Sequence, residues 1–307
     1  MEINREYIEQ RMRDLQRSII SELEKADGKG HFNADSWNHP ESGGGLTCVI
    51  RNGGVIEKGG VNFSAVSGVL SEKAARALEM DTKTFFATGV SIVLHPLNPH
   101  VPIIHMNVRY FEGDGGVYWF GGGIDLTPHY VVLDDAVDFH RKLKDVCDLT
   151  DGAFYEEFKT WADDYFYITH RSETRGIGGI FFDRLSEKNR NLSKNELADF
   201  VFSVGKSFAP IYTSLMQKYS AKPYSEDQKR WQLLRRGRYA EFNLAIDRGT
   251  RFGLETGGRT ESILMSLPAE ACWEYNYTPP TGSPEEQTLN YLKKGINWLE
   301  LNLNEGH

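Results

Sequence analysis

The sequence predicts an α+β protein in which helices cover an antiparallel sheet. Three consecutive segments, 87–95, 103–112 and 117–127, have strand patterns and are joined by short turns, as in an antiparallel meander. Helical patterns dominate 134–238, and strand patterns return afterwards. Strands and helices that are segregated along the chain favour an antiparallel sheet. No linker interrupts the chain, so we expect a single domain over 1–307.

The first part of the chain predicts one helix followed by turns. Residues 3–26 have apolar side chains at helical spacing, which predicts a terminal packing helix. Glycine clusters in 41–60 surround a short strand at 47–51, and a pair of hairpin turns explains them without any function. A short helix is expected over 71–80.

Capping signals mark the helices that follow the meander. Asp134 can cap a helix that ends near Leu149, and 153–171 predicts a second, aromatic-rich helix. Ser193 and Ser225 each stand three residues before Glu or Gln, which is capping-box spacing and predicts two further helices.

The last part of the chain predicts a second group of strands. The segments 239–246, 251–256 and 260–267 have strand patterns separated by turns, and a final helix is expected over about 284–302.

Composition excludes several classes of protein. Hydrophobic residues make up 40% of the chain and aromatic residues 12%, which is enough for a large core, while the net charge of −8 disfavours binding to nucleic acid. Three widely spaced cysteines without a CxxC pair disfavour a disulfide framework or a cysteine zinc site and indicate a reducing compartment. The N-terminal segment is charged throughout, and no apolar run is long enough to span a membrane. We therefore expect a cytoplasmic protein without a membrane span.

The segment from Ile104 to Phe111 carries the main functional signal. Its period of two places His105, Asn107 and Arg109 on one face and apolar residues on the other. A titratable ring, an amide and a fixed cation in one row indicate a wall of a polar pocket rather than a strand face in the core.

A glycine triplet, 121–123, precedes Asp125. Glycines at this density let a bulky planar ligand approach the backbone, and RGIGGIFFD at 175–183 is a second signal of close backbone approach. The alternative is a β-bulge in which Asp125 caps the turn at Thr127 and Pro128. The sequence leaves both interpretations open.

Basic residues are concentrated near the end of the helical region. Between Lys229 and Arg259 there are eight basic and three acidic residues, and arginine suits carboxylate or phosphate held by two hydrogen bonds. Together with Arg109 and Arg175, this window favours a polyanionic small molecule. No phosphate-binding glycine motif is present. The alternative is a solvated helix end with intramolecular ion pairs.

Four of the nine histidines stand out, but their spacing does not indicate a metal site. His95 and His105 can face each other across neighbouring strands, whereas His140 and His170 fall on separate predicted helices. A single histidine is more often a surface or hydrogen-bonded residue than a metal ligand, so spacing alone leaves both possibilities open.

These residues belong to longer motifs that carry a resemblance. The motifs are HMNVRYFE (105–112), WFGGGIDLTP (119–128), DDYFYITHR (163–171), RGIGGIFFD (175–183), LLRRGRYAEFNL (233–244), DRGTRFGLETGGRTESILMSLP (247–268) and WEYNY (273–277). In this order, over nearly the whole chain, they resemble the oxygen-dependent coproporphyrinogen III oxidases in their bacterial-type soluble form.

The resemblance implies an activity, a fold and an assembly. Members convert coproporphyrinogen III to protoporphyrinogen IX in haem synthesis, using O₂ to turn two propionates into vinyls with release of CO₂. They use no flavin, haem or nicotinamide. The implied fold is a large flat antiparallel sheet flanked by helices on both faces, and the implied assembly is a homodimer. We expect its interface within about 240–302, because TESILMSL as a strand would expose more apolar area than an edge normally does.

The resemblance also implies site residues. His105 is implied to be a proton donor, and the four histidines named above are implied to bind a divalent metal in bacterial-type members. These two roles conflict at His105. The residues implied to bind substrate are Ser91, Asn107, Arg109, Gly257, Gly258 and Arg259.

A tetracarboxylate macrocycle agrees with an arginine excess in an acidic protein and with a glycine-rich, aromatic pocket. Our hypothesis is that Asp125 holds or deprotonates a pyrrole N–H, so that O₂ reacts with an electron-rich ring. Arg109, Arg259 and Arg175 would anchor carboxylates, and His105 would move protons. Two other classes remain open, a histidine-metal oxygenase or hydrolase and a non-catalytic tetrapyrrole carrier.

Overall fold

Seven antiparallel strands form one sheet, with strand order β1-β2-β3-β4-β5-β6-β9. The computed structural model describes residues 3–70, 82–255 and 258–301, so the helix expected over 71–80 lies outside the described residues. The strands are β1 (Asn33–Asn38), β2 (Ser42–Arg51), β3 (Ile56–Val69), β4 (Thr84–Pro96), β5 (Ile103–Gly113), β6 (Tyr118–Thr127) and β9 (Gly179–Leu185). The predicted meander is confirmed as β4, β5 and β6 at the centre of this sheet.

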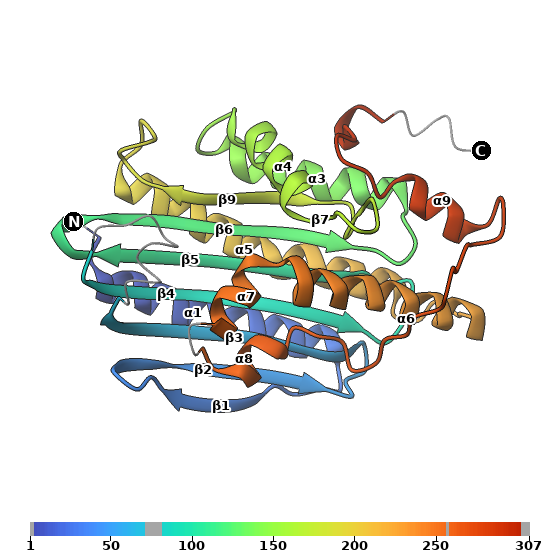
Figure 1. Cartoon of the computed structure of the whole chain (residues 1–307), viewed down its shortest axis with the longest axis horizontal. Helices are drawn as coiled ribbons and strands as arrows, with labels where there is room; N and C mark the ends of the chain where they lie inside the picture. The colour runs from blue at the N-terminus through green and yellow to red at the C-terminus, as the bar shows by residue number, and fades with distance from the viewer. Residues whose placement is uncertain (1–2, 71–81, 256–257, 302–307) are drawn as a thin grey trace.

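Helices cover both faces of the sheet (Figure 1). On one face, α1 (Arg5–Asp27) packs on β3 and β4, and α5 (Lys194–Tyr219) packs on β5 and β6. On the other face lie α6 (Glu226–Glu241), α7 (Arg248–Glu255) and α8 (Thr260–Leu264). The predicted α+β class, with helices on both faces of an antiparallel sheet, is therefore confirmed.

Other elements surround β9 and the end of the chain. α3 packs against α5, and α4 packs against β9. The remaining elements are α3 (Leu133–Asp148), α4 (Phe154–Tyr165), the hairpin β7 (Tyr167–Ile168) and β8 (Glu173–Thr174), α9 (Pro284–Asn290), and the 3₁₀ turns η1 (Asp114–Gly116) and η3 (Trp298–Glu300).

Local sequence signals explain where the long helices begin. Ser193 and Ser225 each form the predicted capping box, in which the serine side chain and the Glu or Gln three residues later bond reciprocally to backbone N–H groups. α1 buries an apolar stripe that includes Ile8, Met12 and Ile19, as its helical spacing predicts.

The three strands predicted after residue 238 are wrong. Residues 242–246 form a π-helical segment, η2 (Phe242–Ile246), and the other two segments coincide with α7 and α8. The alternation in 239–246 was misleading because α6 continues directly into η2, where the N–H of Asp247 donates to the carbonyl of Phe242 at 2.8 Å. The turn expected between 246 and 251 is instead the start of α7, since the side chain of Asp247 accepts a hydrogen bond from the N–H of Thr250 at 2.7 Å.

Two predicted helices are shorter than expected. α4 ends at Tyr165 because 167–174 pair as the β7–β8 hairpin. α9 ends at Asn290, and Gly295, at φ +76°, precedes the separate turn η3.

Candidate active site

The face of β5 that lies under α6, α7 and α8 is polar, as the sequence predicts. Ile104, Met106 and Val108 are fully buried on the opposite face. His105, Asn107 and Arg109 are only partly buried on the face below α6 to α8. Strand alternation therefore separates the core side chains from the site side chains.

Strand register builds a flat surface of small side chains around Arg109. Ser91 of β4 and Gly123 of β6 lie opposite Asn107, and Gly89 and Gly121 lie opposite Arg109. We call this surface the glycine-rich floor; it comprises Gly89, Ser91, Asn107, Gly121 and Gly123. A Cβ atom at Gly121 would lie 2.8 Å from Nε of Arg109, so the glycine is needed for the arginine to lie across the strand.

His105 lies beside the floor and contacts Asp125 on the neighbouring strand β6. Its Nδ1 atom is 2.8 Å from Oδ1 of Asp125. Its side chain is 20% exposed, whereas that of Asp125 is 1% exposed. His105 can therefore meet a ligand, while Asp125 lies behind it.

Asp125 forms a buried ion pair with Arg175. Nη2 of Arg175 donates to Oδ1 at 2.7 Å and Nε donates to Oδ2 at 3.2 Å. Burial alone would raise the pKa of Asp125, but the Arg175 charge and the His105 hydrogen bond lower it below its ordinary value. Asp125 is therefore ionised, and both of its oxygens are occupied by protein groups. This geometry does not support our hypothesis that Asp125 contacts a pyrrole N–H.

Arg175 is enclosed by the protein. Its guanidinium carbon lies 4.4 Å from the ring centre of Phe166, 4.7 Å from that of Tyr239 and 4.5 Å from that of Phe242. The residue is 3% exposed. Because Arg175 is buried and bonds Asp125, this geometry favours a positioning role for Arg175, and its expected role as an anchor of a substrate carboxylate stays a prediction.

Arg109 lies over the floor and is partly exposed. Nη1 donates to Oδ1 of Asn107 at 2.9 Å, and Nη2 donates to Oδ1 of Asp183 in β9 at 2.9 Å. Its guanidinium carbon lies 5.8 Å from the ring of Trp119 and 5.9 Å from that of Phe181. A guanidinium has five N–H donors, so Arg109 keeps donors for a ligand.

Arg259 approaches the same face from the start of α8. It pairs with Asp35 of β1, and its Nη1 atom donates to Ser262 at 3.2 Å. Ser262 in turn bonds Thr47 at 2.7 Å, which holds α8 on β2. Of the two glycines predicted beside Arg259, Gly258 bonds the carbonyl of Gly253 through its N–H at 2.8 Å, and Gly257 lies outside the described residues.

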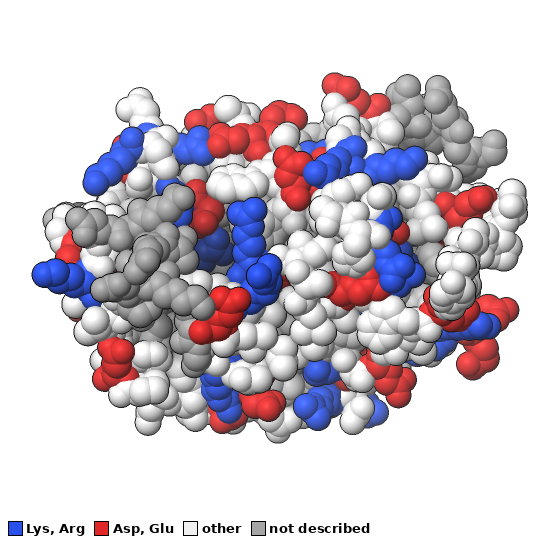
Figure 2. Space-filling model, viewed as in Figure 1, with Lys and Arg blue, Asp and Glu red and all other residues white. Residues whose placement is uncertain are grey.

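Most of the remaining basic window forms intramolecular ion pairs, as the alternative interpretation predicts. The pairs are Lys229 and Arg236 with Glu57, Arg230 with Glu274, Arg235 with Glu173, and Arg238 with Glu241. Arg248 and Arg251 on α7 differ, because both are exposed and neither has a carboxylate partner in the described part of the chain. Basic side chains gather around a recess on this face, near α7 (Figure 2).

The four histidines implied to bind a metal have other partners. His140 uses both ring nitrogens, one toward the hydroxyl of Tyr155 and one toward the carbonyl of Ile177, each at 3.0 Å. His95 bonds the carbonyl of Ser266 at 2.8 Å, and His170 bonds Glu241 at 2.8 Å on the surface.

Burial lowers the pKa of His95 and of His140 to about 3, so both rings are neutral. No group of three or more His, Cys, Asp or Glu side chains among the described residues could hold a metal ion. Within this chain, His95, His105, His140 and His170 therefore do not fit a common metal.

Several site residues were missed by sequence reasoning. Asp183 is the last residue of the RGIGGIFFD motif, but only the pairing of β9 with β6 brings it to Arg109. Phe85 and Trp119 stack on opposite sides of Phe111, at 6.1 Å and 5.2 Å between ring centres. This aromatic wall borders the floor on the side away from His105.

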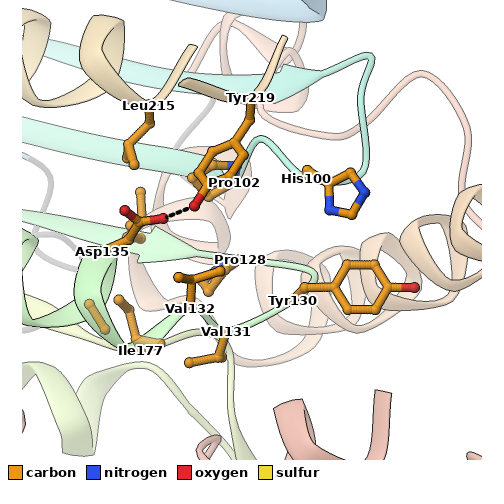
Figure 3. Close-up of a pocket in the computed structure, with 12 residues that line it drawn as sticks. His100, Pro102, Pro128, Tyr130, Val131, Val132, Asp135, Ile177, Leu215 and Tyr219 are labelled. Atoms are coloured by element: carbon orange, nitrogen blue, oxygen red, sulfur yellow. Dashed lines mark hydrogen bonds between the residues drawn. The ribbon is translucent and has the colours of Figure 1, made fainter. Parts of the chain in front are cut away.

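A separate small pocket lies between the start of α3 and the end of α5 (Figure 3). Its lining is mostly apolar, and the hydroxyl of Tyr219 is bonded there to Asp135 at 2.5 Å. It has room for about one water molecule, with an internal volume of about 20 Å³. It shares no residue with the glycine-rich floor and is too small for a macrocycle.

Known proteins are similar to this chain over most of its length. A family model described as coproporphyrinogen III oxidase matches residues 7–298. An oxygen-dependent coproporphyrinogen-III oxidase of Drosophila melanogaster is 47% identical over 93% of this chain and 76% of its own length. One of Prochlorococcus marinus is 46% identical over 93% of this chain and 88% of its own length. A chloroplastic one of Glycine max is 45% identical over 96% of this chain and 80% of its own length.

None of the helices in the described part of the chain is both long and apolar enough to cross a bilayer.

The predicted resemblance is confirmed by the family match and by the identity to these relatives: the chain belongs to the oxygen-dependent coproporphyrinogen III oxidase family.

Proposed function

We propose that this chain converts coproporphyrinogen III to protoporphyrinogen IX by oxidative decarboxylation of two propionates, with O₂ as the co-substrate. The observation that carries the proposal is the polar face of the sheet. It combines a flat glycine-rich floor, an oriented histidine beside it, Arg109 over the floor and Arg259 at its margin. A macrocycle that bears several carboxylates matches all three features.

The reaction balances as R–CH₂–CH₂–COO⁻ + O₂ + H⁺ → R–CH=CH₂ + CO₂ + H₂O₂ for each propionate. The bond from the side chain to the carboxylate breaks to give CO₂, and the carbon next to the ring loses one hydrogen. O₂ takes up two electrons and two protons. One proton comes from the side chain and one from the protein or solvent, so a proton donor at the floor is required.

We assign that proton donor to His105. An ionised Asp125 accepts the proton of Nδ1, which leaves Nε2 as the nitrogen that exchanges protons with the ligand or with peroxide. Asp125 and Arg175 are positioning residues in this proposal, since both are buried. They hold the ring of His105 and fix its tautomer.

We assign carboxylate binding to Arg109 and Arg259, with Arg248 and Arg251 of α7 as further cations above the floor. Arginine forks bind carboxylates with two hydrogen bonds. Ser91 and Asn107 supply hydroxyl and amide groups at the centre of the floor. Holding the macrocycle at several carboxylates brings one propionate next to His105.

We also propose a homodimer and a cytoplasmic location. Support for a homodimer is the exposure of large apolar side chains within the expected interface region, including Trp273 at 54% and Tyr275 at 96%. Light scattering of the purified protein tests it. Support for the cytoplasm is that Cys48, Cys147 and Cys272 are free thiols, and cell fractionation tests it.

The activity test compares aerobic and anaerobic incubation with coproporphyrinogen III, each with and without a chelator. Product is measured as protoporphyrin fluorescence after oxidation. We expect turnover with O₂ and none without it, and turnover that survives chelation. Binding without any O₂-dependent product would indicate a carrier and refute the proposal. Loss of activity on chelation that a divalent metal restores would indicate metal-dependent chemistry.

A further inference from the structure

The two arginines assigned to substrate are each already paired with an aspartate from an outer strand of the sheet. Arg109 pairs with Asp183 of β9, and Arg259 pairs with Asp35 of β1. β1 and β9 are the first and last strands in the sheet order. The same arrangement therefore occurs at both edges of the polar face.

The carboxylate of Asp183 lies on the glycine-rich floor itself. Its Oδ1 atom is 2.9 Å from Nη2 of Arg109. A Cβ atom added to Gly121 would be only 2.5 Å from this oxygen. The oxygen therefore occupies the space above the glycine triplet, where a bound macrocycle would present its side chains to Arg109.

The Arg109–Asp183 pair is accessible and weakly held. The two side chains are 31% and 29% exposed, and ion pairs of this kind contribute little to stability. Arg109 would stay in place without Asp183, because Asn107 accepts a hydrogen bond from Nη1 and aromatic rings flank the guanidinium. An incoming carboxylate can therefore replace Asp183 without rebuilding the site.

We propose that Asp183 is a specificity-determining residue that occupies the position of a substrate propionate and is displaced by it. Asp35 has the same role at Arg259. This inference rests on the proposed function, because it requires a carboxylate-bearing ligand on the floor. Each aspartate balances the charge of its arginine until a ligand carboxylate replaces it, so a ligand without a carboxylate at that position gains nothing from the arginine.

The two exchange positions set a distance that the ligand must span. Arg109 belongs to β5, and Arg259 bonds side chains of β1 and β2. β2 and β5 are three strand spacings apart, or about 14 Å. A macrocycle with carboxylates on opposite sides reaches both positions, whereas a small monocarboxylate reaches only one.

The test measures binding without turnover. Coproporphyrin III, the oxidised and unreactive tetracarboxylate, is titrated by fluorescence against wild type, Asp183→Asn and Asp35→Asn. Asparagine keeps the shape of aspartate but removes the competing charge. We expect the dissociation constant to fall about two- to ten-fold in each variant, since a weak ion pair no longer competes. The tetramethyl ester of the same porphyrin, which has no carboxylates, should bind all proteins alike.

Asp199→Asn is the matched control. Asp199 of α5 forms an ion pair with Arg11 of α1, on the opposite face of the sheet. This variant should bind coproporphyrin III like wild type. Asp183→Ser serves as the second variant if Asp183→Asn does not fold, as judged by circular dichroism. Unchanged or weaker binding of coproporphyrin III by a folded Asp183 variant would overturn the inference, because Asp183 would then orient Arg109 or be irrelevant to binding.

The outcome is separable from the proposed function. Wild-type turnover of coproporphyrinogen III with O₂ is measured on the same preparation. Absence of turnover refutes the function. If wild type is active but the Asp183 variants bind coproporphyrin III no more tightly, only the proposal that a propionate displaces Asp183 is refuted.

Discussion

The Nδ1 atom of His105 lies 2.8 Å from Oδ1 of Asp125, across the β5–β6 ladder. Because the pKa of Asp125 is lowered by Arg175 and His105 against the effect of burial, the carboxylate is ionised and accepts the Nδ1 proton. The buried carboxylate of Asp125 therefore fixes the tautomer of His105 with the proton on Nδ1, and Nε2 is the nitrogen available to a ligand.

Replacing Asp125 with Asn should lower kcat by at least about 100-fold, because the amide no longer fixes the tautomer of His105. It should also destabilise the fold by about 3–5 kcal/mol, since Arg175 is left buried without a counter-charge. Steady-state kinetics and urea unfolding measure the two effects. The control is Asp163→Asn, which breaks another buried ion pair, with Lys159; it should lose stability but keep kcat. A near-normal kcat in Asp125→Asn would exclude the positioning role.

Replacing His105 with Gln should reduce kcat by about 10²–10⁴-fold, the usual contribution of a positioned acid or base. Binding of coproporphyrin III should change little, because the arginines and the floor remain. Single-turnover assays and fluorescence titration separate chemistry from binding. His31, which is 83% exposed beside α1, provides the matched His→Gln control. Equal loss of binding and turnover in His105→Gln would point to a substrate-binding role instead.

Replacing Arg109 or Arg259 with Lys should raise KM about 10- to 100-fold while kcat falls less. Lysine keeps the charge but loses the planar fork, and a hydrogen bond to a charged group is worth about 1.5–3 kcal/mol. Initial-rate kinetics with coproporphyrinogen III test this. Arg11→Lys, on the opposite face of the sheet, should leave KM unchanged. If all three variants behave alike, the arginines are not carboxylate anchors.

Replacing Gly121 with Ala should impair binding while the protein still folds. The new Cβ would meet the far ends of two side chains, 2.5 Å from Asp183 and 2.8 Å from Arg109, so both must move off the floor. We expect KM to rise about ten-fold, comparable with loss of one good hydrogen bond. Gly152→Ala, where nothing lies within 4 Å of the added Cβ, is the control. An unchanged KM in Gly121→Ala would show that the floor tolerates a methyl group and is not a contact surface.

Replacing Asp27 with Asn should lower stability in a pH-dependent way. The carboxylate of Asp27 accepts backbone N–H bonds from Gly30, Gly54, Val55 and Ile56, at 2.6–2.9 Å. Although burial acts in the opposite direction, these bonds lower the pKa of Asp27 below its usual 3.8. Asparagine would aim a fixed N–H₂ group at some of these donors, and we expect a loss of about 2–3 kcal/mol near neutral pH.

The sign of the pH effect follows from the lowered pKa of Asp27. Its stabilisation is complete above the unfolded-state value of about 3.8 and is lost as the pH falls through the lower folded-state value. The difference between wild type and Asp27→Asn should therefore shrink below about pH 4. Urea unfolding across this range measures it, with Asp145→Asn at an exposed position of α3 as control. A difference that is independent of pH would mean that the carboxylate charge contributes nothing.

Local alternation was enough to predict which face of the central strands is polar. Alternation in β5 assigned Ile104 to the core and His105 to the site, because successive side chains of a strand point to opposite faces whatever the rest of the fold does. The capping boxes at Ser193 and Ser225 are likewise confined to four residues, and both were predicted correctly. The family was also recognisable from the order of long motifs.

Contacts between segments that are distant in the chain set which charged side chains are buried in ion pairs and which stay exposed. Arg175 and Asp125 are 50 residues apart, and they pair with each other inside the protein. Arg109 and Asp183 meet only because β9 joins the sheet beside β6. Residues 242–246 alternate like a strand but continue helix α6 as a π-helical segment. Local periodicity cannot decide these cases, because ion pairing and the choice between helix and sheet there depend on partners that are distant in the chain.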